Sequence, residues 1–511
     1  MQAADASMKH LSSWAMPVLL CWVAFGLRLG PLWANRFHSD EALYATWALR
    51  IATWHDPLLA GAAPDKPPLL FYTQAAAFLV LGHAEVAARL AGLIAGVVSV
   101  ALVWRLALII PLTPFFSQAW AKKGEATANV AAMAMALSPF AILFSPTAFL
   151  DPLMVMFALA SLVAVMRRRH GWAGVWLGLA AATKVQALIF LPLIMAFAVL
   201  RAPRLKHRAN SSSLLKQAVR FIVSLAVPVS IVLVWDRLRG GAPFWIQQTV
   251  NYGGIRPVYA GEVLPRLAGW ASWLPYFFGL PLLVVLIVGL PVLVIYDLTR
   301  GARTWPAVFD LTLTAFALAY FFLHWLLAFP TWDRYLLGLV PVMCVLLGRL
   351  ASLAVGWLAA WIRSTQVAGL MVVSLTVALM IPSAVQAAQS ALPVGGDHGP
   401  HDGVDRVSAY LRELPKGTVV YDHWLGWTLR YYLWDAPAYV AYFATPGWLA
   451  EDLHVFGRTS PRYVVFPADE STTRVERAIA PEGFGLAPVL SGQDRHGQPT
   501  FTLYRIESYD R

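Results

Sequence analysis

Apolar runs of roughly 20 residues recur along the chain from residue 11 to about residue 388, and short polar loops separate them. A helix needs roughly 20 such residues to cross the hydrocarbon core of a bilayer. The 511-residue chain is 59% hydrophobic and only 13% charged, with a mean hydropathy of +0.60, which no ordinary soluble domain approaches. The sequence therefore predicts an α-helical polytopic membrane protein.

The expected spans follow the limits of the apolar runs. Residues 11–31 form the first span, and a second run covers 86–110. Nine further runs lie at about 126–144, 148–166, 171–183, 187–200, 218–236, 272–297, 307–329, 335–351 and 367–386. The stretch 68–82 is short for a crossing and begins after two prolines, so we interpret it as an interfacial helix. This assignment gives roughly 11 transmembrane helices plus interfacial helices.

The first apolar run has a second interpretation. Because Lys9 and His10 precede it, residues 11–31 could form a secretory signal peptide. The run is long for the apolar part of such a peptide, however, and no clear small-x-small cleavage site follows it. We therefore expect a retained first helix that starts on the cytoplasmic side.

The net charge of +11 would suit a nucleic-acid partner in a soluble protein, but here it indicates membrane topology. The basic clusters are Lys122-Lys123, Arg167-Arg168-Arg169, the group Arg201, Arg204, Lys206 and Arg208, the pair Arg300 and Arg303, and finally Arg349 and Arg363. We expect every cluster to face the cytoplasm, which requires that 68–82 does not cross. An odd number of crossings then leaves the C-terminus outside, and no nucleic-acid partner is expected.

The composition changes sharply after Ala391, through a segment rich in glycine and proline, into a water-soluble pattern. Helices are expected over 403–414 and 470–480. Short strands are expected over 418–422, 437–443, 462–467 and 500–506. This alternation indicates a small α/β domain. The chain should thus divide into a membrane domain, residues 1–390, and an extracytoplasmic domain, residues 391–511.

Charged residues gather in the first outer loop, within residues 32–67. Asp40 and Glu41 begin a stretch with the spacing of a short surface helix, which either Asp40 or its neighbour Ser39 could simply cap. A carboxylate that faces a water-filled cavity there can instead act as a general base toward an acceptor hydroxyl. Lys66, held before two prolines, suits a phosphate group, although a snorkelling lysine that meets lipid headgroups is the simpler alternative.

Four more polar residues lie beside the predicted spans. Asp151 opens an apolar run and is either a helix cap or a site residue. Lys184 lies between two runs that are each short for a crossing, and an ionisable residue at such depth is a candidate site residue. Arg256 and Arg334 lie in outer loops, where each could bind an anionic headgroup, stack on a sugar ring or anchor the loop at the interface.

The sequence offers no metal-ligand set with familiar spacing, and its two cysteines lie inside apolar runs. It also contains no glycine-rich phosphate loop, so a nucleotide-driven pump is not expected. We therefore predict no metal and no cofactor.

Six short motifs occur in a fixed order along the chain. They are Asp40-Glu41-Ala-Leu-Tyr44-Ala, Asp65-Lys66-Pro67-Pro68-Leu69, Glu85-Val-Ala-Ala-Arg89-Leu, Phe149-Leu150-Asp151, Thr183-Lys184 and Arg334-Tyr335-Leu336-Leu337. Through this ordered set, residues 10–390 resemble the polyprenyl-phosphate-dependent GT-C glycosyltransferases, the superfamily of the protein O-mannosyltransferases and the bacterial aminoarabinose lipid A transferase. The set is far more specific than any one motif.

The resemblance implies inverting transfer of one hexose or pentose from a polyprenyl phosphate carrier, commonly undecaprenyl phosphate. It implies an acceptor such as lipid A or another envelope glycan, on the periplasmic face of a bacterial inner membrane. Family roles carried onto matching positions make Asp40 the catalytic carboxylate with Glu41 beside it, and make Lys66, Lys184 and Arg334 ligands of the carrier phosphate. Further site candidates are Tyr44, Asp65, Arg89, Asp151, Arg256 and Tyr335.

Three positions depart from the family pattern. Leu43 stands where the aminoarabinose transferases usually have arginine, Asp65 where they have glutamate, and Val185 where glycine is frequent. These departures leave the sugar and the acceptor open more than the reaction type. Two other functions also stay open: a protein O-glycosyltransferase of the same superfamily, and a lipid-linked sugar transporter or flippase. A transporter predicts internal pseudo-symmetry, of which the sequence gives no sign.

Overall fold

The computed structural model of the chain describes residues 2–110, 124–201, 211–301 and 304–509. These residues form two compact units. The helical unit comprises the chain up to Leu32 together with Ile51–Gly82 and Val86–Gly395. The mixed unit comprises Trp33–Arg50, His83–Glu85 and the chain from Gly396 onward. The segment that carries Asp40 and Glu41 thus groups with the C-terminal residues.

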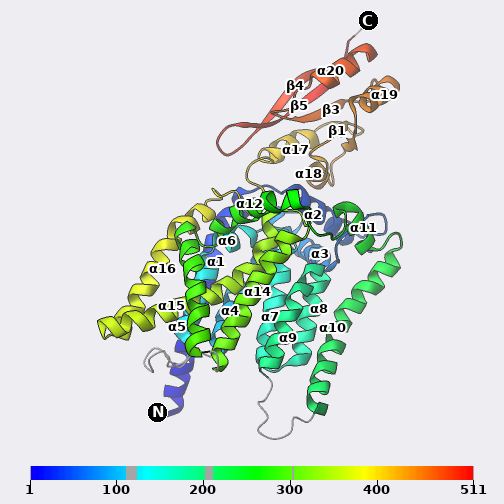
Figure 1. Cartoon of the computed structure of the whole chain (residues 1–511). Coiled ribbons are helices and arrows are strands. Elements are labelled where there is room, and N and C mark those ends of the chain that lie inside the picture. The colour runs from blue at the N-terminus through cyan, green and yellow to red at the C-terminus, as the bar shows by residue number, and fades with distance from the viewer. Residues whose placement is uncertain (1, 111–123, 202–210, 302–303, 510–511) are drawn as a thin grey trace. The chain divides into compact units, whose positions relative to one another are not determined.

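Helices make up nearly all of the helical unit (Figure 1). They are α1 (Gln2–Ala34), α3 (Leu69–Leu81), α4 (Glu85–Ile109), α5 (Glu125–Leu137), α6 (Pro139–Phe144), α7 (Asp151–Met166), α8 (His170–Thr183), α9 (Leu191–Leu200), α10 (Ser211–Arg239), α11 (Phe244–Tyr252), α12 (Val263–Trp273), α13 (Leu280–Tyr296), α14 (Trp305–Leu326), α15 (Val340–Ile362) and α16 (Thr365–Ala388). Figure 1 shows α7, α8 and α10 side by side, and α8 packs against both neighbours.

Seven helices among the described residues are long and apolar enough to cross a membrane. They cover Ala15–Ala34, Glu85–Ile109, Leu215–Arg239, Leu280–Thr299, Pro306–Leu326, Asp333–Ile362 and Thr365–Ala388. The chain is therefore a helical multi-pass membrane protein, as predicted. The total of roughly 11 crossings stays a prediction, because the difference lies in shorter apolar helices such as α3, α7 and α9.

Three predicted spans have wrong limits. The run 126–144 is broken, because Ser138 ends α5 and its Oγ accepts the backbone N–H of Ala141 at 3.3 Å as the cap of α6. The run 272–297 divides between α12, a 3-10 turn and α13, which begins only at Leu280. The run 335–351 starts as a 3-10 helix, η5 (Asp333–Leu339), and α15 then continues to Ile362. The basic residues at 122–123, 204, 206, 208 and 303 lie outside the described residues.

Close contact of α4 with the segment after α6 depends on glycine. A Cβ added to Gly96 would lie 1.9 Å from Ser145 Oγ, and one added to Gly92 would lie 2.4 Å from the carbonyl oxygen of Thr147. The fully buried Arg28 of α1 donates from Nε to the same Ser145 Oγ at 2.9 Å. These contacts fix the segment that leads directly into Asp151 at the start of α7.

The mixed unit contains a five-stranded sheet with the order β2-β1-β3-β5-β4. Its strands are β1 (Val419–Asp422), β2 (Tyr439–Tyr442), β3 (Arg462–Pro467), β4 (Phe484–Gln493) and β5 (Pro499–Ser508). The first three are parallel, and β5 runs antiparallel to both β3 and β4. The helices of this unit are α2 (Ser39–Ala52), α17 (Val404–Arg412), α18 (Gly426–Tyr432), α19 (Pro446–Phe456) and α20 (Thr473–Ile479).

Helices cover both faces of this sheet. One core joins Val407 of α17 and Leu429 of α18 to Val420 of β1 and to residues of β3 and β5. The other joins Leu449 of α19 and Ile479 of α20 to alternate residues of the same strands. The α/β prediction is therefore confirmed, with all four expected strands and both expected helices present. The strand β4 and the helices α18 and α19 were not expected.

Candidate functional site

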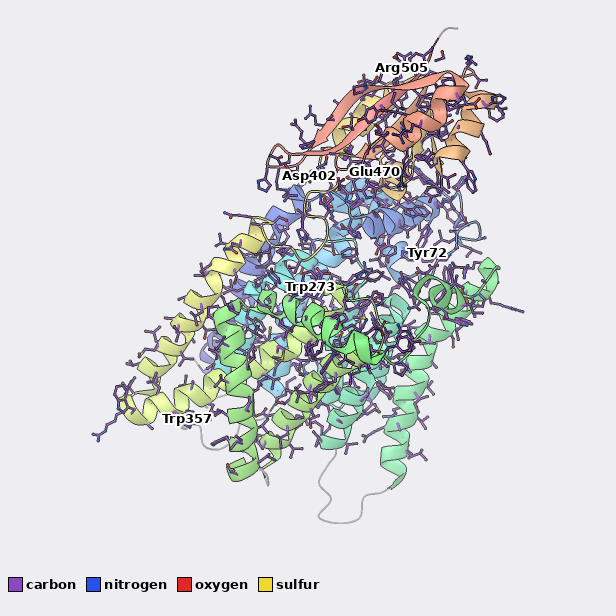
Figure 2. The ribbon with its side chains drawn as sticks, turned by 45° about the horizontal axis from the view of Figure 1, so that its top comes forward. Tyr72, Trp273, Trp357, Asp402, Glu470 and Arg505 are labelled. Carbon is purple, nitrogen blue, oxygen red and sulfur yellow. The ribbon has the colours of Figure 1, made fainter. Side chains whose placement is uncertain are left out.

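Lys66 is held in a polar loop of the helical unit. Tyr72 of α3, labelled in Figure 2, donates its hydroxyl to the Pro57 carbonyl oxygen at 2.8 Å and so ties the loop to the helix. Lys66 is only 4% exposed, and its Nζ donates to Asp65 Oδ2 at 2.8 Å and to Tyr252 Oη at 3.1 Å. Asn251 also donates to Asp65 Oδ2, at 3.1 Å. The ammonium thus donates to two side chains, that of the preceding residue and that of Tyr252 at the end of α11.

Lys184 and Asp151 form a second buried ion pair. Asp151 is the first residue of α7, and Lys184 follows the last residue of α8. Their Nζ and Oδ1 atoms are 2.7 Å apart, and both side chains are almost fully buried. The ammonium also lies 4.5 Å from the centroid of the Tyr335 ring. Burial of this kind is tolerated because each charge has a partner.

Arg334 lies among aromatic rings at the start of η5. Its guanidinium carbon is 4.4 Å from the Trp332 ring centroid and 4.8 Å from that of Phe149. Trp332 in turn meets the Tyr252 ring edge-on at 5.7 Å. Tyr335 is fixed through its carbonyl oxygen, which accepts the Tyr320 hydroxyl at 2.6 Å. The rings therefore link the surroundings of Lys66 to those of Arg334.

The three cations act on one another electrostatically. Burial lowers the pKa of Lys184 to about 8; Asp151 opposes this shift, while the charges of Arg334 and Lys66 add to it. We call Lys66, Lys184 and Arg334 the cation cluster. All three cations are buried, so they lie in a poorly solvated setting. Such a setting favours a bound anion, because an anion relieves the repulsion.

Asp40, Glu41 and Tyr44 lie in the first two turns of α2, in the mixed unit. Glu41 is fully buried, and its carboxylate accepts the backbone N–H of His38 at 3.0 Å. The backbone N–H of Asp40 donates to His38 Nδ1 at 3.1 Å. Tyr44 is 2% exposed and packs on Trp47. Glu41 therefore serves as a helix cap, whereas the Asp40 side chain is partly exposed.

Two predicted site residues have local partners apart from the cation cluster. Arg89 of α4 is 1% exposed and donates to the Leu32 carbonyl oxygen at 3.3 Å. Arg256 makes a two-pronged pair with Glu262, with N–O distances of 2.7 and 2.8 Å. Arg256 lowers the pKa of Glu262 to about 2. Arg89 thus joins α4 to the end of α1, and Arg256 joins two residues of the segment between α11 and α12.

The contribution of Asn251, Tyr252 and Trp332 was missed in the sequence. None of these three residues carries a functional signal of its own in the sequence. The end of α11 brings Asn251 and Tyr252 to Asp65 and Lys66, and Trp332 joins them through its contact with the Tyr252 ring. Across the ranges that the model describes, no group of three or more His, Cys, Asp or Glu side chains could hold a metal ion.

The chain has the GT-C type of fold, a helical membrane part with a small sheet domain, as the sequence motifs indicated. Residues 65–235 match the family model described as dolichyl-phosphate-mannose-protein mannosyltransferase. That segment carries Asp65, Lys66, Asp151 and Lys184.

Solved structures share this fold over nearly the whole chain. ArnT from Cupriavidus metallidurans matches in its apo state with a TM-score of 0.60, and bound to undecaprenyl phosphate with a TM-score of 0.58. Each match has 15% identity and covers 98% of both chains. The arabinofuranosyltransferase AftD from Mycobacteria matches with a TM-score of 0.48 and 17% identity, over 98% of this chain and 42% of that one. No curated protein matched the sequence.

Proposed function

We propose that the chain is an inverting glycosyltransferase that moves one sugar from a polyprenyl phosphate carrier to an envelope acceptor. The observation that carries this proposal is the cation cluster in a GT-C fold. Three buried cations whose charges act on one another suit an anionic phosphate group better than they suit a neutral ligand. The undecaprenyl phosphate bound to ArnT, which has the same fold, supports the same class of carrier.

In the proposed reaction, Asp40 takes the proton from the acceptor hydroxyl while the acceptor oxygen attacks the anomeric carbon. The bond between that carbon and the phosphate oxygen breaks from the opposite side, so the configuration inverts. Polyprenyl phosphate leaves with the bonding electrons. Lys66, Lys184 and Arg334 stabilise the negative charge that develops on the leaving phosphate. Tyr335 and the neighbouring rings hold two of these cations in place.

The proposed location is a bacterial inner membrane, with the site and the mixed unit on the periplasmic side. This orientation rests on the distribution of basic residues along the sequence. The proposed acceptor is lipid A or another envelope glycan. A protein acceptor remains the alternative within the same reaction, because it would use the same donor chemistry. A transporter is disfavoured, since the sequence gives no sign of the internal pseudo-symmetry that this function predicts.

Binding of undecaprenyl phosphate to the purified protein in lipid nanodiscs tests the donor half of this proposal. Lys66→Ala removes a cation that the proposal places against the carrier phosphate, so we expect the dissociation constant to rise about 10- to 100-fold. Lys416→Ala is the matched control, because Lys416 is exposed in the mixed unit. Asp40→Asn should bind the carrier like the wild type and yet fail to transfer sugar. Equal carrier affinity of Lys66→Ala and the wild type would count against the phosphate role.

A further inference from the structure

A cavity lies at the carboxyl end of the parallel strands in the mixed unit. It has a volume of about 420 Å³ and is lined by Asp422, His423, Trp424, Gly426, Trp427, Arg430 and Tyr442. Asp422 is the last residue of β1, and Tyr442 is the last residue of β2. The cavity is therefore formed by the ends of two neighbouring strands and by the loop and helix that follow β1.

The topological switch point of the sheet lies between β1 and β3, beside this cavity. After β1 the chain enters α18 on one face, whereas after β3 it enters α20 on the other. In open α/β sheets, ligands bind outside the carboxyl ends of the strands where the connections diverge in this way. Glu470, labelled in Figure 2, follows β3 and accepts from His423 Nε2 at 2.8 Å. This contact joins the two loops that flank the switch point.

The lining residues have the chemistry of a saccharide site. Trp427 and Tyr442 are 40% and 63% exposed, so two aromatic rings are open to a ligand at the cavity. The apolar face of an aromatic ring can stack on the apolar face of a sugar ring, and the polar edges of both rings stay free for hydrogen bonds. Arg430 lies with its guanidinium carbon 5.1 Å from the Trp427 ring centroid. Asp422 accepts the backbone N–H of Trp424 at 3.0 Å and so shapes the loop.

Arg430 gives the cavity a charge preference. Within the described parts of the chain, no carboxylate lies within ion-pair distance of its guanidinium. Burial raises the pKa of Asp422, whereas the charge of Arg430 acts to lower it. A ligand with an anionic group would thus pair with Arg430 at the rim of the cavity.

Trp424 connects this cavity to the segment that carries Asp40. Its ring stacks on His401, with a centroid distance of 5.4 Å and an angle of 16°. His401 Nδ1 donates to Asp397 Oδ1 at 2.7 Å, which leaves Nε2 facing Ser39 Oγ at 3.4 Å. Ser39 is the first residue of α2 and directly precedes Asp40. One histidine therefore bridges the cavity wall and the helix start that bears the proposed base.

We infer that this cavity binds a short acidic saccharide, with a sugar ring stacked on Trp427 and Tyr442 and its acidic group paired with Arg430. We assign this saccharide to the acceptor, which makes the acceptor a glycan. This assignment to the acceptor rests on the proposed function, whereas binding of the saccharide does not. The cavity holds the acceptor while His401 keeps the start of α2 in register with it.

Calorimetric titration of the full-length protein in detergent tests the inference without donor or turnover. The probes are cellobiouronic acid, a disaccharide that ends in glucuronate, and the neutral disaccharide cellobiose. We expect millimolar or tighter binding of the acidic probe and weaker binding of the neutral one. Trp427→Ala should weaken both probes about tenfold or more, because a large stacked ring is lost. Arg430→Gln should remove the preference for the acidic probe and leave cellobiose binding unchanged.

Trp448→Ala is the matched control, since Trp448 is 60% exposed on α19 and does not line the cavity. It should bind both probes like the wild type. The inference is overturned if the wild type binds neither probe at millimolar concentration, or if Trp427→Ala and Trp448→Ala bind alike. Asp40→Asn should retain full probe binding. Failure of probe binding leaves the proposed reaction untouched, whereas normal turnover of Asp40→Asn overturns the reaction and not the cavity.

Discussion

The charge of Lys184 should make carrier binding depend on pH in a defined direction. Burial lowers the pKa of this lysine to about 8, and the charges of Arg334 and Lys66 act in the same sense. A lysine is charged below its pKa, so the cation cluster is complete at pH 7 and loses one charge as the pH rises past 8. The carrier phosphate itself changes little in this range, because its second ionisation lies near pH 6.

The size of the effect follows from the charged fraction of Lys184. With a pKa of about 8, roughly nine-tenths of the free protein has the charged lysine at pH 7 and roughly one-tenth at pH 9. If the phosphate binds only the charged form, the affinity falls about tenfold between these pH values, or ~1.4 kcal/mol. Stability changes in the opposite sense. In the unfolded chain a lysine has a pKa of about 10.4, so between pH 8 and pH 10 Lys184 binds more protons in the unfolded chain than in the folded one. The free energy of unfolding therefore rises over this range.

The assay is titration of undecaprenyl phosphate into nanodisc-embedded protein at pH 7, 8 and 9. Lys184→Arg is the control, because arginine keeps its charge throughout this range. We expect a steep loss of affinity for the wild type and a flat profile for Lys184→Arg, whatever its affinity at pH 7. Parallel profiles for the two proteins would refute the assignment of the pH dependence to Lys184.

Asp151→Asn removes the carboxylate that opposes the lowering of the Lys184 pKa, so carrier binding should already be weak at pH 7 and recover toward pH 6. Titration of the carrier at both pH values checks this, and a profile like that of the wild type would contradict it. Gly96→Ala places a Cβ 1.9 Å from Ser145 Oγ and should lower the free energy of unfolding by about 1–3 kcal/mol in thermal melts. Gly26→Ala is the control, because its Cβ would meet open space, and it should leave the free energy of unfolding unchanged. Glu41→Ala removes the acceptor for the His38 N–H and should lower the free energy of unfolding by about 1 kcal/mol, while sugar transfer persists. A stable but inactive variant would instead indicate a catalytic role for Glu41.

The membrane fold could be predicted because span length and apolar composition are local properties. The break at Ser138 was missed, since the apolar run continues through it and only the Ser-Pro cap signal marks it. The strand β4 was missed for a related reason. It contains Pro488 and two glycines, which argue against a strand, yet it lies at the sheet edge where a proline is tolerated, and a bulge follows Pro488.

The candidate site could be predicted only in part. Lys66, Lys184 and Arg334 are predicted one at a time through their motifs, and the structure brings their charges within range of one another. The rings of Tyr252 and Trp332 could not be found, because an aromatic residue near a membrane surface is common in any case. The grouping of residues 33–50 with the C-terminal unit was also invisible. It depends on contacts such as that of Ser39 with His401, which lie 362 residues apart.

The central claim is that this chain adds a sugar to an envelope acceptor and that Asp40 is the base. Mass spectrometry of lipid A and total envelope glycans, from cells with the wild-type protein or Asp40→Asn, tests it most directly. We expect one species that is heavier by a single sugar in wild-type cells and absent from the variant, with both proteins present at equal levels in the membrane. Identical envelope masses in the two strains would contradict the account.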